Sequence, residues 1–153
     1  KFGIAVVWEP HLPGTRHDGA AMLAQDGTPV IGLTLRHDRL DNFWFTLLHE
    51  CVHIIKHLHV PGETFVDDTE RPFDTDEKEN EANRMARDSL IPQEAWRRSD
   101  SNRLKTAEAI NTLAAKLKIH PAIVAGRIRR EAGNYKLFST LVGHRAVKKV
   151  LNA

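Results

Sequence analysis

The chain has 153 residues, of which 41 % are apolar and 27 % charged, an ordinary globular composition with no apolar run near the ~18 residues of a membrane span. Its single cysteine, Cys51, excludes an intramolecular disulfide and fits a reducing compartment, so we expect a cytoplasmic protein. The net charge of +2 is uneven: residues 1–96 carry 9 Lys/Arg and 17 Asp/Glu, whereas residues 97–153 carry 13 Lys/Arg and 3 Asp/Glu.

The first third of the chain predicts a small, mostly antiparallel sheet. Runs of β-branched and apolar residues predict strands, and Asp26-Gly27 is typical of a hairpin turn between two of them. The predicted strands cover 3–8, 20–24 and 29–35. A Pro- and Gly-rich loop is expected at 9–19, and an irregular acidic loop at 63–77.

Helical periodicity dominates the rest of the chain. Asp41 is a good N-cap for a helix that should reach about Leu58, before Pro61 and Gly62. Further helices are predicted at 76–89, 91–96, 106–133 (two helices joined near "IHP"), 135–141 and 144–151. The sequence therefore predicts an α+β domain over 1–96 and a basic helical subdomain over 97–153 that packs on it. A single domain, or a fragment of a longer protein, remains an alternative.

One segment, "FTLLHECVH", carries the chemistry. On a helix, His49 and His53 lie one turn apart on the same face, where two imidazoles can bind one metal ion. Glu50 can reach a water on that ion, and zinc lowers the pKa of such a water toward ~7. The H-E-x-x-H pattern therefore predicts a zinc hydrolase site with Glu50 as the general base.

The third ligand has three candidates. His59 would give a metzincin-like pattern, but Lys56 stands where that pattern needs a Gly to end the helix. Glu79 has Asn83 four residues later, which resembles the gluzincin arrangement of a ligand Glu followed by a residue that orients a ligand histidine. Glu81 is a competing carboxylate. We expect Glu79 to bind the metal and Asn83 to hydrogen-bond a ligand imidazole.

The segments "FTLLHECVH" and "EKENEANRMARDSLIP" resemble the ImmA/IrrE family of metallopeptidases, of the type fused to XRE/HigA-like antitoxin regulators. Residues 46–92 match its pattern closely, with Asn83 where Asp is common. The resemblance implies a bacterial, zincin-like endopeptidase with Zn²⁺ at His49, His53 and Glu79. It also implies a substrate peptide that adds along the strand near 30–35, and a repressor or antitoxin as substrate or partner.

Three alternatives follow from the same residues. The fold could act as a regulatory module of a toxin–antitoxin or transcription regulator with little or no turnover. A structural zinc site would instead need a fourth ligand, such as His57 or His59. The segment "LAAKLKIHPAIVAGRIRRE" looks like a helix-turn-helix with basic Arg127, Arg129 and Arg130. Its apolar residues indicate packing, however, so we expect no direct DNA binding by this part of the chain.

Overall fold

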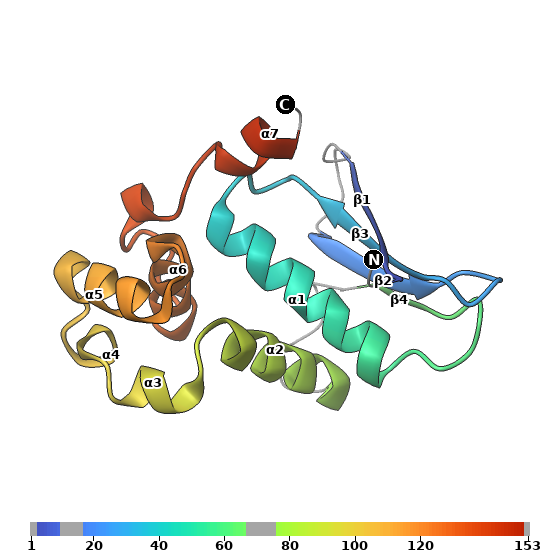
Figure 1. Ribbon diagram of the computed structural model, residues 1–153, viewed down its shortest axis with the longest axis horizontal. Coiled ribbons are helices and arrows are strands. Elements are labelled where there is room, and N and C mark those ends of the chain that lie inside the picture. Colours follow the sequence, from blue (N-terminus) through green and yellow to red (C-terminus); the bar gives the residue numbers. More distant parts are fainter. Residues whose placement is uncertain (1–2, 10–16, 67–75, 152–153) are drawn as a thin grey trace. The chain divides into compact units, whose positions relative to one another are not determined.

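The computed structural model describes residues 3–9, 17–66 and 76–151 (Figure 1). Its backbone contacts divide the chain into a first unit, Lys1–His37 with Thr46–Ala86, and a second unit, Asp38–Phe45 with Arg87–Ala153. The division runs through two helices, α1 (Leu40–Lys56) and α2 (Glu77–Leu90), each of which contributes residues to both units. The predicted domain boundary after residue 96 stays a prediction, because this division does not test it.

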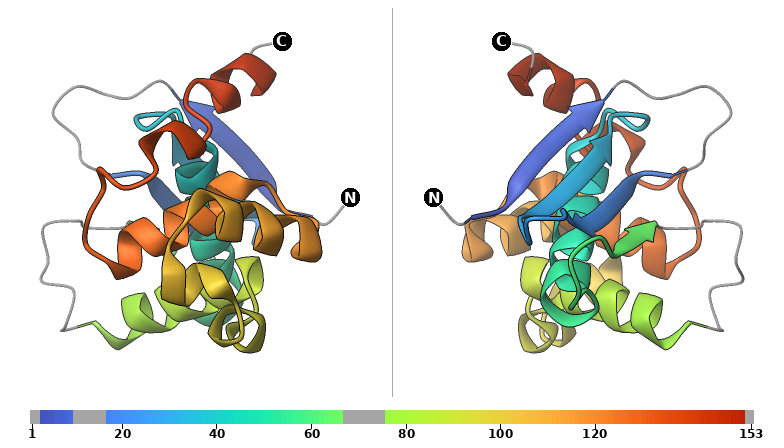
Figure 2. Two further views of the ribbon diagram at one scale, coloured as in Figure 1. Left: turned by 90° about the vertical axis from the view of Figure 1, so that its left-hand side faces the viewer. Right: turned by 90° about the vertical axis from the view of Figure 1, so that its right-hand side faces the viewer.

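The first unit contains a mixed four-stranded sheet with the order β1-β3-β2-β4. β1 and β3 pair in parallel, whereas β2 pairs antiparallel with both β3 and β4. The right-hand view of Figure 2 shows β3 between β1 and β2. The strands are β1 (Ala5–Glu9), β2 (Gly19–Leu23), β3 (Pro29–Thr34) and β4 (Thr64–Val66).

One face of this sheet forms the core of the first unit. Ala21 on β2 and Ile31 on β3 are register partners, and both are fully buried. Leu33, two residues after Ile31, is also buried, as expected for alternating side chains on a strand. All five residues of β1 are exposed.

Two expectations about this sheet are wrong. The segment 63–77 was expected to be irregular throughout, but Thr64–Val66 forms β4; residues 67–75 lie outside the described part of the chain. The strand near 30–35 was expected to be an edge open to a substrate peptide. β3 is an inner strand paired on both sides, so its backbone groups are already used, and the edges are β1 and β4.

The second unit is built from short helices around an apolar core. Trp96, Ile110, Val124 and Ile128 are among the buried side chains of this core. Capping residues separate the helices: Thr106 accepts the N–H of Ala109, and His120 accepts the N–H of Ala122. The elements are α3 (Gln93–Arg97), α4 (Asp100–Leu104), α5 (Ala107–Leu117), α6 (Pro121–Glu131), η1 (Ser139–Leu141) and α7 (Ala146–Leu151).

The predicted helices of this unit need two corrections. Helix α4 was not predicted, because five residues are too few to show a helical period. The stretch 135–141 was expected to be helical, but only the 3-10 turn η1 forms there. The pair of helices predicted within 106–133 is present as α5 and α6.

The three arginines of α6 are used inside the second unit. Arg127 and Arg129 are buried, and the Arg130 guanidinium lies 3.5 Å from the ring centroid of Phe45. These contacts agree with the interpretation of α6 as a packing helix.

The class is α+β, as expected, with helices in the majority. Within the described part of the chain, no helix combines the length and the apolar character needed to cross a bilayer.

Candidate metal centre

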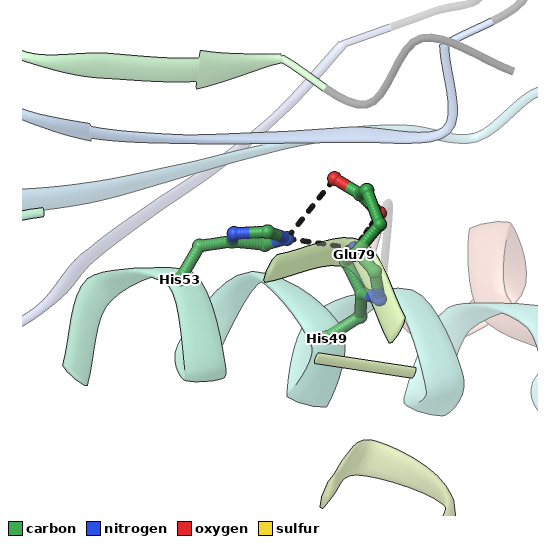
Figure 3. A group of neighbouring side chains, drawn as sticks. All are labelled: His49, His53 and Glu79. Carbon is green, nitrogen blue, oxygen red and sulfur yellow. Dashed lines mark hydrogen bonds and ion pairs between the residues drawn. The ribbon is translucent and has the colours of Figure 1, made fainter. Parts of the chain in front are cut away.

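Three side chains of the first unit converge on one point (Figure 3). His49 and His53 come from α1, and their Nε2 atoms lie 2.9 Å apart. The carboxylate oxygens of Glu79, from the first turn of α2, lie 3.2 Å from Nε2 of His49 and 3.4 Å from Nε2 of His53. Among the described residues, these three form the group of His, Cys, Asp or Glu side chains that could hold a metal ion.

The spacing and chemistry of these donors fit a zinc ion. Tetrahedral ligands at about 2.0–2.2 Å from zinc lie about 3.3 Å from one another. The donor separations of 2.9, 3.2 and 3.4 Å are close to this value. Two imidazoles and one carboxylate also leave one tetrahedral position open, which is the arrangement of catalytic rather than structural sites.

Helix α1 turns a polar face inward. Each buried polar residue of this face lies three or four positions from another one, so these side chains lie on one side of the helix. Ile55, on another face, is 68 % exposed. Because buried polar groups are costly without partners, this face needs a ligand or counter-groups. Its buried members are Thr46, His49, Glu50, His53 and His57.

The start of α2 places the third donor. Asp76 accepts the N–H of Lys78 through Oδ1 at 2.9 Å, and its carbonyl accepts the N–H of Asn80 at 3.0 Å. Glu79 therefore falls in the first helical turn, where the helix dipole favours a carboxylate. Asn83 follows one turn later on α2. Its role in orienting a ligand histidine stays a prediction.

His53 is held in a neutral form. Its ring stacks on Phe65 of β4, with centroids 3.9 Å apart and an interplanar angle of 22°. Burial, followed by the charges of His49, His57 and Lys78, lowers the pKa of His53 to about 3. A neutral imidazole is the form whose ring nitrogen can bind a metal.

Glu50 lies between the two histidines in sequence and is fully buried. A Cβ built on Gly19 would lie 2.9 Å from Cγ of Glu50 and 2.7 Å from Cγ2 of Thr46. Gly19 therefore makes room on β2 for the Glu50 side chain. Sequence reasoning missed Gly19, because it placed this glycine at the end of the predicted loop 9–19, directly before a predicted strand.

The other candidate ligands lie elsewhere. Glu81 contacts His57, with 3.1 Å between its Oε2 and the Nε2 of His57. His59 is exposed, and its backbone N–H donates to Glu63. The predicted helix end near Leu58 is also slightly late, because α1 ends at Lys56. Neither Glu81 nor His59 joins the three-donor group.

Cys51 is half-buried beside this site. Burial, and secondarily the negative charge of Glu50, raises the pKa of its thiol. A raised pKa keeps the sulfur protonated, which disfavours metal binding by Cys51.

The match to known families agrees with this geometry. A family model of the peptidase M78 group, described as the IrrE N-terminal-like domain, matches residues 1–129. The chain belongs to this family. The comparison with curated proteins gives no match.

Membership of the IrrE N-terminal-like family confirms the resemblance drawn from "FTLLHECVH" and "EKENEANRMARDSLIP". It supports a peptidase-like role for the chain, with a His-His-Glu group able to hold a metal. A fused XRE-type regulator stays an expectation.

Proposed function

We propose that the chain is a zinc-dependent endopeptidase that cleaves a regulatory protein such as a transcriptional repressor. The observation that carries the proposal is the convergence of His49, His53 and Glu79, beside a buried Glu50 one residue after the first histidine. A purely structural zinc site has no use for that fourth side chain. Family membership supports the peptidase class, and the repressor substrate rests on the family resemblance alone.

Each side chain has a separate task in this mechanism. His49, His53 and Glu79 would hold the zinc ion, which would supply an acidified water and a Lewis acid for the scissile carbonyl. Glu50 takes a proton from the attacking water and passes it to the leaving amine. The low pKa of His53 keeps this ligand neutral.

The substrate would lie along β4. β4 is an edge of the sheet, and its Phe65 stacks directly on His53. An extended peptide that adds to this edge would therefore pass close to the donors. This location replaces the one expected from the sequence, because β3 is an inner strand.

The test compares wild type with Glu50→Gln in two assays. We expect both proteins to retain near-stoichiometric zinc after dialysis, measured by elemental analysis. Wild type should cleave a quenched-fluorescence peptide library, and Glu50→Gln should be at least about 10²-fold slower, since a general base contributes 10²–10⁴-fold. Equal cleavage by the two proteins would disprove the role of Glu50.

The complete burial of Glu50 favours a second candidate. A general base needs access to the reacting water, and a closed site is compatible with a regulatory module that binds an antitoxin- or repressor-type partner with little turnover. Gel electrophoresis of the partner protein, with and without chelator, distinguishes the two functions. If chelator protects the partner from cleavage, the chain is a peptidase; if chelator changes only the affinity for an intact partner, the chain is a binding module.

A further inference from the structure

We infer that Glu81 and His57 form a hydrogen-bonded relay that fixes the tautomer and the ring orientation of His53 as a metal ligand. This inference rests on the proposed metal site and adds two residues to it. Neither residue belongs to the three-donor group. Both are therefore positioning residues, which act on the metal through His53.

The hydrogen bonds of the relay begin at the ring nitrogen of His53 that does not face the metal donors. Nε2 of His53 faces the donors, 2.9 Å from Nε2 of His49 and 3.4 Å from Oε1 of Glu79. Its other ring nitrogen, Nδ1, lies 2.9 Å from Nδ1 of His57. The Nε2 of His57 in turn lies 3.1 Å from Oε2 of Glu81. The three side chains thus form one continuous chain of hydrogen bonds.

Metal binding allows only one direction for the protons in this chain. A neutral imidazole carries one N–H donor and one acceptor nitrogen. Because His53 needs the lone pair of Nε2 for the metal, its proton is on Nδ1 and is donated to Nδ1 of His57. His57 is then protonated on Nε2 and donates to Glu81. A carboxylate accepts and does not donate, so Glu81 selects this arrangement over its reverse.

The fold explains why these residues meet. His49, His53 and His57 are spaced by four, and the N–H of His57 still bonds to the carbonyl of His53 at 2.9 Å, so His57 extends the row by one turn. On α2, Glu79 and Glu81 are two residues apart and serve different histidines. His57 is 7 % exposed, whereas the Glu81 side chain is 37 % exposed. The relay therefore leads from the buried ligand to the surface.

The test measures zinc affinity by competition with a fluorescent chelator. Loss of a group that orients a metal ligand typically lowers metal affinity 10–100-fold. We expect His57→Leu, which has no acceptor for His53, to bind zinc about 10–100-fold more weakly than wild type. His57→Gln keeps an amide oxygen as acceptor and should recover most of the loss.

Glu81→Ala should also weaken zinc binding, and it should add nothing to His57→Leu, because Glu81 acts through His57. The matched control is Glu77→Ala, which removes an exposed carboxylate from the same helix and should leave zinc affinity within about 2-fold of wild type. Cobalt absorption spectra of the same variants report the ligand geometry independently of activity. Thermal unfolding of the metal-free proteins shows which variants fold.

Several outcomes overturn the relay. If folded His57→Leu or Glu81→Ala binds zinc as tightly as wild type, the relay is overturned and the three-donor site is unaffected. Lower metal-free stability with unchanged zinc affinity would show that the two residues are only structural. If His57→Leu does not fold, the zinc affinities of Glu81→Ala and Glu77→Ala decide whether the relay exists: equal affinities overturn it, and weaker binding by Glu81→Ala alone supports it. A wild type that takes up no zinc would overturn the proposed site and the relay together.

Discussion

Gly19 on β2 lies directly against the side chain of Glu50 on α1. A Cβ at position 19 would sit 2.9 Å from Cγ of Glu50, and real Cβ atoms are essentially never found so close to another heavy atom. Glu50 is fully buried, so it has little room to withdraw. The absence of a side chain at position 19 is therefore part of how the site holds its carboxylate.

Gly19→Ala should destabilise the protein by about 1–3 kcal/mol, the usual cost of overpacking a filled interior. Urea unfolding of the metal-free protein measures the change in the free energy of unfolding. Gly32→Ala is the matched control, since a Cβ on this glycine of β3 would meet only the carbonyl oxygen of Ala20, at 4.0 Å. Equal effects of the two substitutions would show that crowding at Glu50 is not the cause.

Glu79→Ala should lose zinc, because it removes one of three donors. We expect near-stoichiometric zinc in dialysed wild type and a large loss in the variant, measured by elemental analysis. Removal of zinc with chelator should lower the Tm of wild type and leave the Tm of Glu79→Ala almost unchanged, since binding to the native state stabilises it.

Glu77→Ala is the control for this experiment, because Glu77 is an exposed carboxylate in the same first turn of α2. It should keep both the zinc and the chelator-dependent Tm. Full zinc retention by Glu79→Ala would move the third ligand to another residue.

The metal-free protein should lose stability on acidification because of His53. Burial lowers the pKa of His53 to about 3 in the folded state, whereas an unfolded histidine titrates near 6.5. Between these two values the unfolded chain binds the extra proton, so the free energy of unfolding falls as the pH drops below 6.5. The contribution of one such proton is at most about 1.4 kcal/mol per pH unit.

Urea unfolding of metal-free wild type and His53→Gln at pH 7.5 and pH 5 tests this expectation. The variant has no titrating group at position 53, so its stability should decline less between the two pH values. An equal decline in both proteins would contradict the lowered pKa of His53.

Arg127 should act as a structural residue of the second unit. It donates to the carbonyl of Ile91 at 2.8 Å, to Oε1 of Gln93 at 2.6 Å and to Glu131 at 2.9 Å. Its guanidinium also lies 4.5 Å from the ring centroid of Trp96. Arg127→Met should therefore cost about 2–3 kcal/mol in the free energy of unfolding, because it leaves the buried carbonyl of Ile91 and two part-buried acceptors without their donor.

Arg98→Met is the control for charge. The Arg98 side chain is 78 % exposed and forms a surface ion pair with Glu94, so its loss should cost less than about 0.5 kcal/mol. Similar urea midpoints for Arg127→Met and wild type would mean that the buried contacts of Arg127 do not stabilise the fold.

The sequence by itself determined the local features. His49 and His53 share a helix face because their spacing matches one helical turn. The approximate extent of α1 followed from Asp41 near its start and from Pro61 and Gly62 after its end, although the helix begins at Leu40, so that Asp41 lies in its first turn and is not the N-cap. Glu79 was predicted as third ligand from its likeness to gluzincins, and the structure brings it to the two histidines. Patterns within one helix are readable because the residues involved are neighbours along the chain.

Only the tertiary structure decided which residues meet across elements. In the sheet, β3 is an inner strand, and β4 forms the edge whose Phe65 stacks on His53. β4 has only three residues, which are too few to show the alternating pattern of a strand in the sequence. The clearance between Gly19 and Glu50 and the pairing of His57 with Glu81 also join distant segments. Such contacts depend on strand order and helix packing, which are set by the burial of the whole core and not by the spacing of residues in any one segment.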